Sequence, residues 1–86
     1  MTEILAVFRS RTQAIDCLQN LKANLVPASL VNTPKEANVG CGLSVKTPES
    51  ALPRVKRIIA GRNYSSFYGY LKIENKYGRT FILPLK

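Results

Sequence analysis

The chain has no histidine and no tryptophan, and it carries 5 acidic residues against 13 Lys and Arg among 86 residues. Without histidine there is neither a Cys-His pair for nucleophilic catalysis nor a histidine-containing metal site. The acidic residues are spread over separate predicted elements, at Glu3, Asp16, Glu36, Glu49 and Glu74. We therefore predict no metal site and no cofactor, and an independent enzyme is the least favoured class of function.

Cysteines and long apolar runs are also scarce. Cys17 and Cys41 are too few for the disulfide framework of a small secreted domain. The opening residues 1–3 lack the basic start and apolar stretch of a signal peptide. The longest apolar run, residues 4–8, is far shorter than the ~20 residues that span a bilayer. We expect a cytoplasmic protein with free thiols and no membrane partner.

The remaining composition predicts one small, basic domain that covers residues 1–86. With 45% hydrophobic residues, the chain has enough apolar side chains to build a core. The formal net charge of +8 attracts polyanions, including nucleic acid and acidic proteins. The basic residues are scattered, however, and only residues 54–57 form a local cluster. Nucleic acid is therefore a less favoured partner than protein.

The hydrophobic pattern predicts strands and helices in a definite order. Ser10 and Gln13 have the spacing of a capping box, in which each side chain bonds the other's backbone amide. Ser50 is the expected cap of a second helix, and Gly61 is its expected left-handed stop. The predicted helices thus cover residues 11–25 and about 50–60, and the predicted strands residues 4–8, 28–33, 43–46, 67–74 and 80–85.

This order is β-α-β-β-α-β followed by one more strand. It predicts an α+β, ferredoxin-like sandwich with an extra C-terminal strand or hairpin, in which both helices cover one face of an antiparallel sheet. The first strand is apolar on both faces, so we expect a homodimer through the open face. Alternation places Tyr68, Tyr70 and Lys72 on one side of the fourth strand, and Phe67, Gly69, Leu71 and Ile73 on the other.

The most distinctive chemical feature is a cysteine between two glycines, Gly40-Cys41-Gly42. In the predicted topology, the start of the third strand lies near the end of the first strand and the start of the first helix. A helix N-terminus and nearby guanidinium groups stabilise a thiolate, so we predict a pKa below ~8.5 for Cys41. The two glycines leave room for a partner or an anion. The candidate thiolate-stabilising or anion-binding residues are Arg9, Ser10, Arg11 and Lys35.

A purely structural interpretation of Cys41 stays open beside this one. Free cysteine is often buried, and Cys41 would then be a small residue at a tight strand entry. Cys17 lies beside the apolar face of the first predicted helix, so core packing is the favoured interpretation there.

Residues 33–45, with the sequence TPKEANVGCGLSV, resemble a loop of the selenium/sulfur carrier protein-like family. The likeness covers roughly residues 3–73. Two features depart from the family pattern: Gly40 stands where a small polar residue is expected, and the C-terminal hairpin extends past the family core. The resemblance implies that Cys41 carries sulfur or selenium, with donor and acceptor proteins as partners.

Two alternatives stand beside the carrier. One is a nucleic-acid-binding module that uses the positive charge together with Tyr68, Tyr70 and Lys72. The other is a protein-binding or self-associating module with no chemistry at Cys41.

Overall fold

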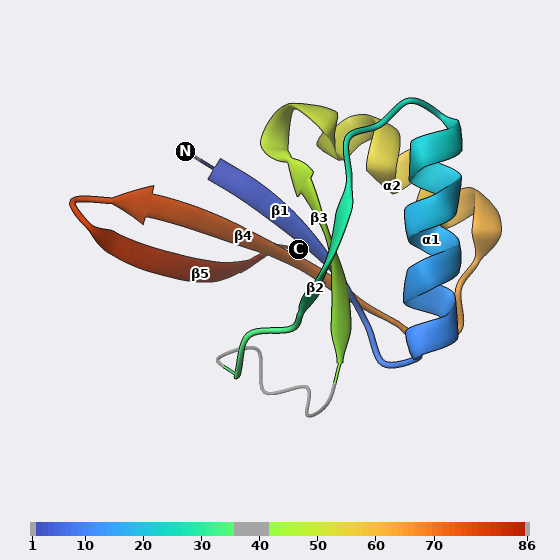
Figure 1. The fold of residues 1–86 in the computed structure, drawn as a ribbon, viewed down its shortest axis with the longest axis horizontal. Coiled ribbons are helices and arrows are strands. Elements are labelled where there is room, and N and C mark those ends of the chain that lie inside the picture. Colours follow the sequence, from blue (N-terminus) through green and yellow to red (C-terminus); the bar gives the residue numbers. More distant parts are fainter. Residues whose placement is uncertain (1, 36–41, 86) are drawn as a thin grey trace.

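The computed structural model describes residues 2–35 and 42–85 and has an α+β architecture. In this part of the chain, five antiparallel strands form one sheet in the order β2-β3-β1-β4-β5 (Figure 1). The α+β class and the extra C-terminal strand are therefore as predicted. In chain order the elements are β1 (Thr2–Phe8), α1 (Arg11–Ala23), β2 (Ser29–Asn32), β3 (Leu43–Pro48), α2 (Leu52–Arg62), β4 (Phe67–Lys76) and β5 (Arg79–Leu85).

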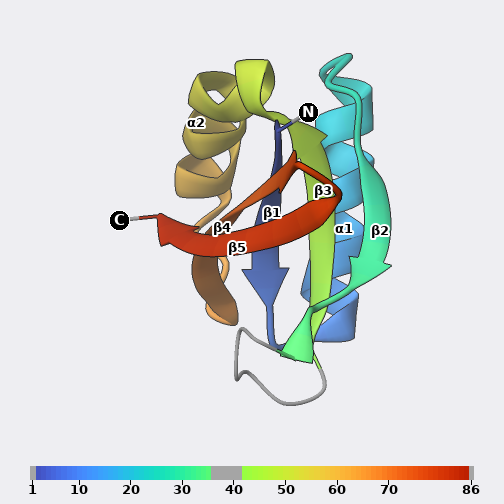
Figure 2. The ribbon, with the colours of Figure 1, turned by 90° about the vertical axis from the view of Figure 1, so that its left-hand side faces the viewer.

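Both helices pack on the same face of the sheet, and the outer part of the β4–β5 hairpin twists over the opposite face (Figures 1 and 2). Alternate residues of β1, Ala6 and Phe8, are buried on the helix side together with Val45 of β3. The helices contribute the buried side chains Ala14, Cys17 and Leu21 from α1 and Val55 and Ile59 from α2. The predicted core role of Cys17 is confirmed.

The other face of β1 is covered within the same chain. Leu5 and Val7 are 1% and 0% exposed and form a second apolar cluster with Leu71. Ile73 of β4 and Ile82 of β5 pack against this cluster, because the twisted hairpin crosses in front of β1 and β3 (Figure 2). The hairpin therefore explains why β1 is apolar on both faces. The homodimer stays a prediction, but the apolar character of β1 no longer supports it.

An irregularity in β4 overturns the simple alternation expected there. Val7 of β1 pairs with Gly69 and Phe8 pairs with Phe67, so Tyr68 is an extra residue on the β4 side. Such a bulge changes the face on which the following side chains lie. Phe67 and Tyr70 consequently pack on the helix side, whereas Leu71 lies in the cluster on the other face. The predictions that Tyr70 lies on the side of β4 opposite Phe67 and that Phe67 shares a face with Leu71 are wrong.

The first helix begins as predicted, but one half of the predicted capping box is absent. The amide of Gln13 donates to Ser10 Oγ at 3.3 Å. The Gln13 side chain does not return to the cap; its Oε1 accepts from the amide and hydroxyl of Ser66 at 2.8 and 2.6 Å. Its Nε2 donates to Ser65 Oγ at 3.0 Å. Gln13 thus joins the start of α1 to the loop before β4.

The same helix ends earlier than residue 25. Leu25 has a left-handed backbone with φ 61° and is 86% exposed. The Val26 amide donates to the Leu21 carbonyl at 2.9 Å, and the Leu25 amide donates to the Lys22 carbonyl at 3.0 Å. This hydrogen-bond pair is a Schellman motif, which satisfies the last carbonyl groups of a helix.

The second helix differs from its prediction at both ends. Ser50 does not cap it; this residue lies in a 3₁₀ turn, Glu49–Ala51, and no side chain caps α2. Gly61 lies inside the helix, and Asn63 supplies the left-handed stop with φ 54° and ψ 53°. Asparagine tolerates this conformation better than most residues other than glycine, so it can replace the expected glycine.

Candidate functional site

Four segments meet at one edge of the fold: the end of β1, the start of α1, the end of β2 and the start of β3 (Figure 1). Between them is a pocket of about 450 Å³. Four of the predicted site residues line it: Arg9, Arg11, Lys35 and Gly42. The other lining residues are Asn32, Thr33 and Leu43. Cys41 and Gly40 lie outside the described residues, but Gly42, the chain neighbour of Cys41, lies in the wall of the pocket.

The arginines stand on either side of the helix cap. The amide of Arg9 donates to the Ser66 carbonyl at 3.0 Å, and its guanidinium lies 5.1 Å from the centre of the Tyr68 ring. Ser10 caps α1, so this predicted site residue has a structural task. Arg11 is the first helical residue, and the first turn of α1 contains no acidic side chain. This helix start therefore keeps its positive electrostatic character.

The far side of the pocket is held by contacts between β2 and β3. The Thr33 amide donates to the Gly42 carbonyl at 3.1 Å, and Thr33 Oγ1 is hydrogen-bonded to Ser44 Oγ at 2.8 Å. A Cβ on Gly42 would stand 3.0 Å from both the Phe8 carbonyl oxygen and Thr33 Oγ1. Close packing thus gives Gly42 a structural reason to be glycine, in addition to the access for a partner that the sequence suggested.

Carboxylates in the described part of the chain pair with cations elsewhere. Asp16 pairs with Arg62, and Glu3 pairs with Lys46, at 2.8 and 3.7 Å. Glu49 and Glu74 both reach Lys72. Across residues 2–35 and 42–85, no carboxylate forms an ion pair with the cationic side chains of the pocket.

Cys17 cannot take over the chemistry proposed for Cys41. Its side chain is completely buried in the core beneath α1. Burial raises the pKa of this thiol to about 12, and the nearby charge of Asp16 adds to the shift. A thiol of this kind has almost no thiolate at neutral pH, and the thiolate is the reactive form.

Asn32 and Thr33 line the pocket but were missed as site residues in the sequence. Both are polar residues at the end of an apolar strand, followed by Pro34. Polar side chains where a strand ends are a usable signal for a site. The sequence alone did not show that they line one pocket with Arg9 and Arg11.

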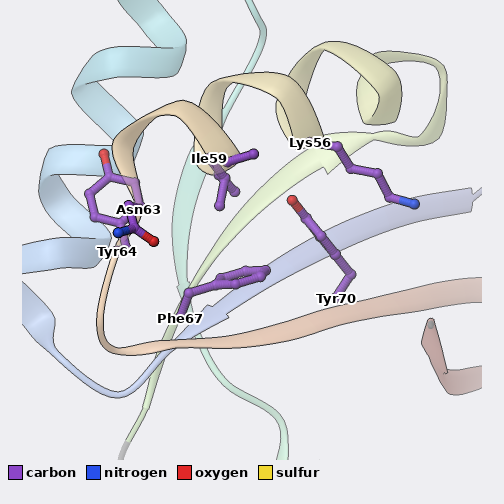
Figure 3. Close-up of a pocket in the computed structure, with 7 residues that line it drawn as sticks. Lys56, Ile59, Asn63, Tyr64, Phe67 and Tyr70 are labelled. Atoms are coloured by element: carbon purple, nitrogen blue, oxygen red, sulfur yellow. The ribbon is translucent and has the colours of Figure 1, made fainter.

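A second pocket, of about 300 Å³, lies between α2 and β4 (Figure 3). Phe67 and Tyr70 point from β4 toward Ile59 of the helix, and Lys56 Nζ lies 5.8 Å from the centre of the Tyr70 ring. Burial is the main cause that raises the pKa of Tyr70 to about 12. Tyr70 therefore belongs to the packing under α2, which leaves Tyr68 as the exposed aromatic residue of the pair.

Two further features of the described residues bear on function. No group of three metal-ligating side chains occurs among residues 2–35 and 42–85. Neither described helix has the length and apolar character needed to cross a membrane.

Comparison with known proteins returned one relationship. A family model described as "Putative Se/S carrier protein-like" matches residues 3–69, which is most of the chain. No curated protein and no solved structure matches. The matched region ends within β4, so the rest of β4 and all of β5 lie beyond it.

Proposed function

The chain belongs to the Putative Se/S carrier protein-like family, and on that premise we propose that it carries sulfur or selenium on Cys41. The observation that carries this proposal is the cationic pocket, which Gly42, the next residue in the chain, helps to form. Arg9 and Arg11 bring positive charge to this pocket from the turn into α1, and Lys35 brings it from the chain after β2.

The charge has a direct chemical consequence for a thiol that joins this edge. Guanidinium and ammonium groups, together with a helix start, favour the thiolate over the thiol. A carrier needs an ionised sulfur and a way to meet its partners, but it needs no general base. The absence of histidine from the chain is compatible with this role.

The proposed transfer is a thiol–persulfide exchange. The Cys41 thiolate attacks the outer sulfur of a donor persulfide, and a new S–S bond forms as the donor's S–S bond breaks. The donor sulfur leaves with the electron pair as a thiolate, so the exchange needs no external oxidant or reductant. The acceptor later removes the outer sulfur by the same chemistry.

The proposal includes the architecture that presents the cysteine. We regard residues 1–86 as one ferredoxin-like domain whose strands β2-β3-β1-β4 are extended by β5. The strand order and the position of both helices on one face support this assignment. This arrangement brings Gly42 and the start of β3 to the same edge as the start of α1.

The experiment that tests the carrier proposal is sulfur loading of the native protein. We expect incubation with a cysteine desulfurase and cysteine to add one sulfur atom, detected by intact-mass spectrometry and mapped to Cys41. Cys17→Ala is the control and should still be loaded, because its thiol is buried. Cys41→Ser should not be loaded. A wild-type protein that stays unmodified contradicts the proposal.

A nucleic-acid-binding function is a second candidate, which the exposed Arg54, Lys56 and Arg57 on α2 favour. Phosphate contacts from such residues make binding depend strongly on salt. A salt titration of single-stranded RNA binding tests this candidate. Cys41→Ser should bind as the wild type does if this function is correct, and Lys56→Gln/Arg57→Gln should bind more weakly.

A further inference from the structure

The pocket at the start of α1 holds more positive charge than one thiolate requires. Arg9, Arg11 and Lys35 all line it, and in the described part of the chain no carboxylate pairs with any of them. Cations that share a small concave space repel each other and favour an anion between them. Arg9 and Arg11 lie two residues apart at the turn into α1, and the fold brings Lys35 to them from the chain after β2.

The other side chains of the pocket suit an oxygen-rich anion. Asn32 has an amide group that can donate hydrogen bonds, and Thr33 has a hydroxyl group. The planar guanidinium groups of Arg9 and Arg11 can each donate two parallel hydrogen bonds to a tetrahedral oxyanion. The Arg9 guanidinium also lies 5.1 Å from the centre of the Tyr68 ring, a contact that uses its face and not its N–H groups. These are the elements of a binding site for a small dianion.

The basic pocket between α1 and α2 provides an internal comparison. It is lined by Asn24, Arg54, Arg57 and Ile58. There the Arg54 guanidinium donates to the Asn24 carbonyl at 2.5 Å, so part of its hydrogen-bonding capacity is already used. That pocket also contains two cations where the pocket at the start of α1 contains three.

We infer that Arg9, Arg11 and Lys35 bind a small sulfur-bearing oxyanion of the thiosulfate class, and that such an anion is a sulfur donor to Cys41. The binding part stands on the pocket alone, whereas the donor part rests on the proposed carrier function. The inference therefore assigns the donor to a class of small molecules.

The transfer step balances without a further reagent. The Cys41 thiolate attacks the outer sulfur of thiosulfate, and an S–S bond forms between the cysteine and that sulfur. The S–S bond inside thiosulfate breaks, and sulfite leaves with the electron pair. One thiolate and one dianion become one persulfide anion and one sulfite dianion, so charge and electrons are conserved. The pocket cations can bind the oxygen atoms of both the thiosulfate and the departing sulfite.

Binding is tested in the Cys41→Ser protein, which separates it from the transfer. We expect calorimetric titration to show that thiosulfate and sulfate both bind. Because each arginine contributes charge-assisted hydrogen bonds, Arg9→Gln/Arg11→Gln should weaken the affinity by about tenfold or more. The matched control, Lys22→Gln/Arg79→Gln, removes the same net charge from exposed positions outside both basic pockets and should change the affinity less than about twofold.

Equal weakening in both double variants, or no binding at all, overturns the inference that the pocket binds a small oxyanion. The cations of the pocket would then be free to contact an acidic segment of a partner protein. Lys35→Gln gives an independent test should the double variant fail to fold, which circular dichroism will reveal. Its affinity should also fall, by a smaller factor.

Transfer is tested in the wild-type protein by measuring sulfite release and the mass of one added sulfur atom. Both should appear with thiosulfate, be slower in Arg9→Gln/Arg11→Gln, and be absent in Cys41→Ser. Loading by the desulfurase without loading by thiosulfate overturns this inference but leaves the carrier function standing. Failure of both donors overturns the carrier function, even where the anion binds.

Discussion

At the scale of single residues, Gly42 has a packing reason to be glycine in addition to the access for a partner that the sequence suggested. Its Cα faces the backbone of β1 and the side chain of Thr33, and both lie 3.0 Å from the position of an added Cβ. One of these neighbours is the carbonyl oxygen of Phe8, a fully buried strand residue that cannot move freely. A side chain here requires these neighbours to move by a few tenths of an ångström, and the backbone of β1 yields less easily than the Thr33 side chain.

We expect Gly42→Ala to lower the free energy of unfolding by about 1–3 kcal/mol, the usual cost of overpacking. Urea denaturation of the wild type and the variant measures this difference. Gly61→Ala is the matched control, because no atom lies within 4 Å of its added Cβ. In the helix, this replacement should raise the stability by about 0.5–1 kcal/mol. Equal effects of the two substitutions would contradict the close approach at Gly42.

At the scale of elements, α1 is joined to its surroundings by polar contacts that its apolar pattern does not reveal. Arg62 Nη2 donates to the two carboxylate oxygens of Asp16 at 3.1 and 2.8 Å, and the Tyr64 hydroxyl donates at 2.6 Å. These contacts connect the middle of α1 to the end of α2 and the following loop. The hydrogen bond from Arg62 is the main cause that lowers the pKa of Asp16.

The stabilisation by Asp16 should therefore depend on pH. A carboxyl group whose pKa is lowered by folding contributes its full stabilisation above its unfolded pKa, about 3.9, and loses it as the pH falls through the lower folded value. We expect the stability advantage of the wild type over Asp16→Asn to be constant from pH 5 to 7 and to shrink below about pH 4.

Thermal unfolding of both proteins across this pH range provides the measurement. Arg62→Gln should show the same reduced dependence on acid, and combining it with Asp16→Asn should have little further effect. Two stability curves that stay parallel down to pH 2 would exclude this role of the Asp16–Arg62 pair.

At the scale of the whole molecule, the β4–β5 hairpin completes the core on the side of the sheet without helices. Leu5 and Val7 would otherwise be exposed on that face, and Ile82 of β5 packs against their cluster. The next residue, Leu83, is 49% exposed and is absent from both apolar clusters. The hairpin thus covers the face of β1 that a second copy of the chain was expected to cover.

Ile82→Ala should lower the free energy of unfolding by about 1–3 kcal/mol because it removes apolar contacts from this cluster. Leu83→Ala, on the same strand, should change it by less than about 0.5 kcal/mol. Chemical denaturation of the two variants provides the comparison. If Leu83→Ala proves the more damaging substitution, the hairpin packs in another register or the chain self-associates through its exposed side.

The sequence determined the kind and order of the elements, because hydrophobic period and backbone preference act over a few residues, but it did not determine the ends of α2, where Ser50 and Gly61 were expected to act as cap and stop. Ser10 identified the start of α1, and Cys17 was assigned correctly to the core because it shares a helix face with leucines. The α+β class followed from the order of such elements. The alternation of β4 was misread because the bulge at Tyr68 depends on how β4 pairs with β1.

Only the tertiary structure decided which distant residues meet. It added Asn32 and Thr33 to the pocket lined by the predicted residues Arg9, Arg11 and Lys35, and it turned Tyr70 inward under α2. It also covered Leu5 and Val7 with the hairpin. The physical reason is that side-chain position depends on strand register, twist and helix packing, which arise from contacts between segments far apart in the chain. Local patterns gave the order of the elements, and through it the edge where Arg9, Arg11 and Lys35 lie, but they did not give the register of β4 or the path of the hairpin.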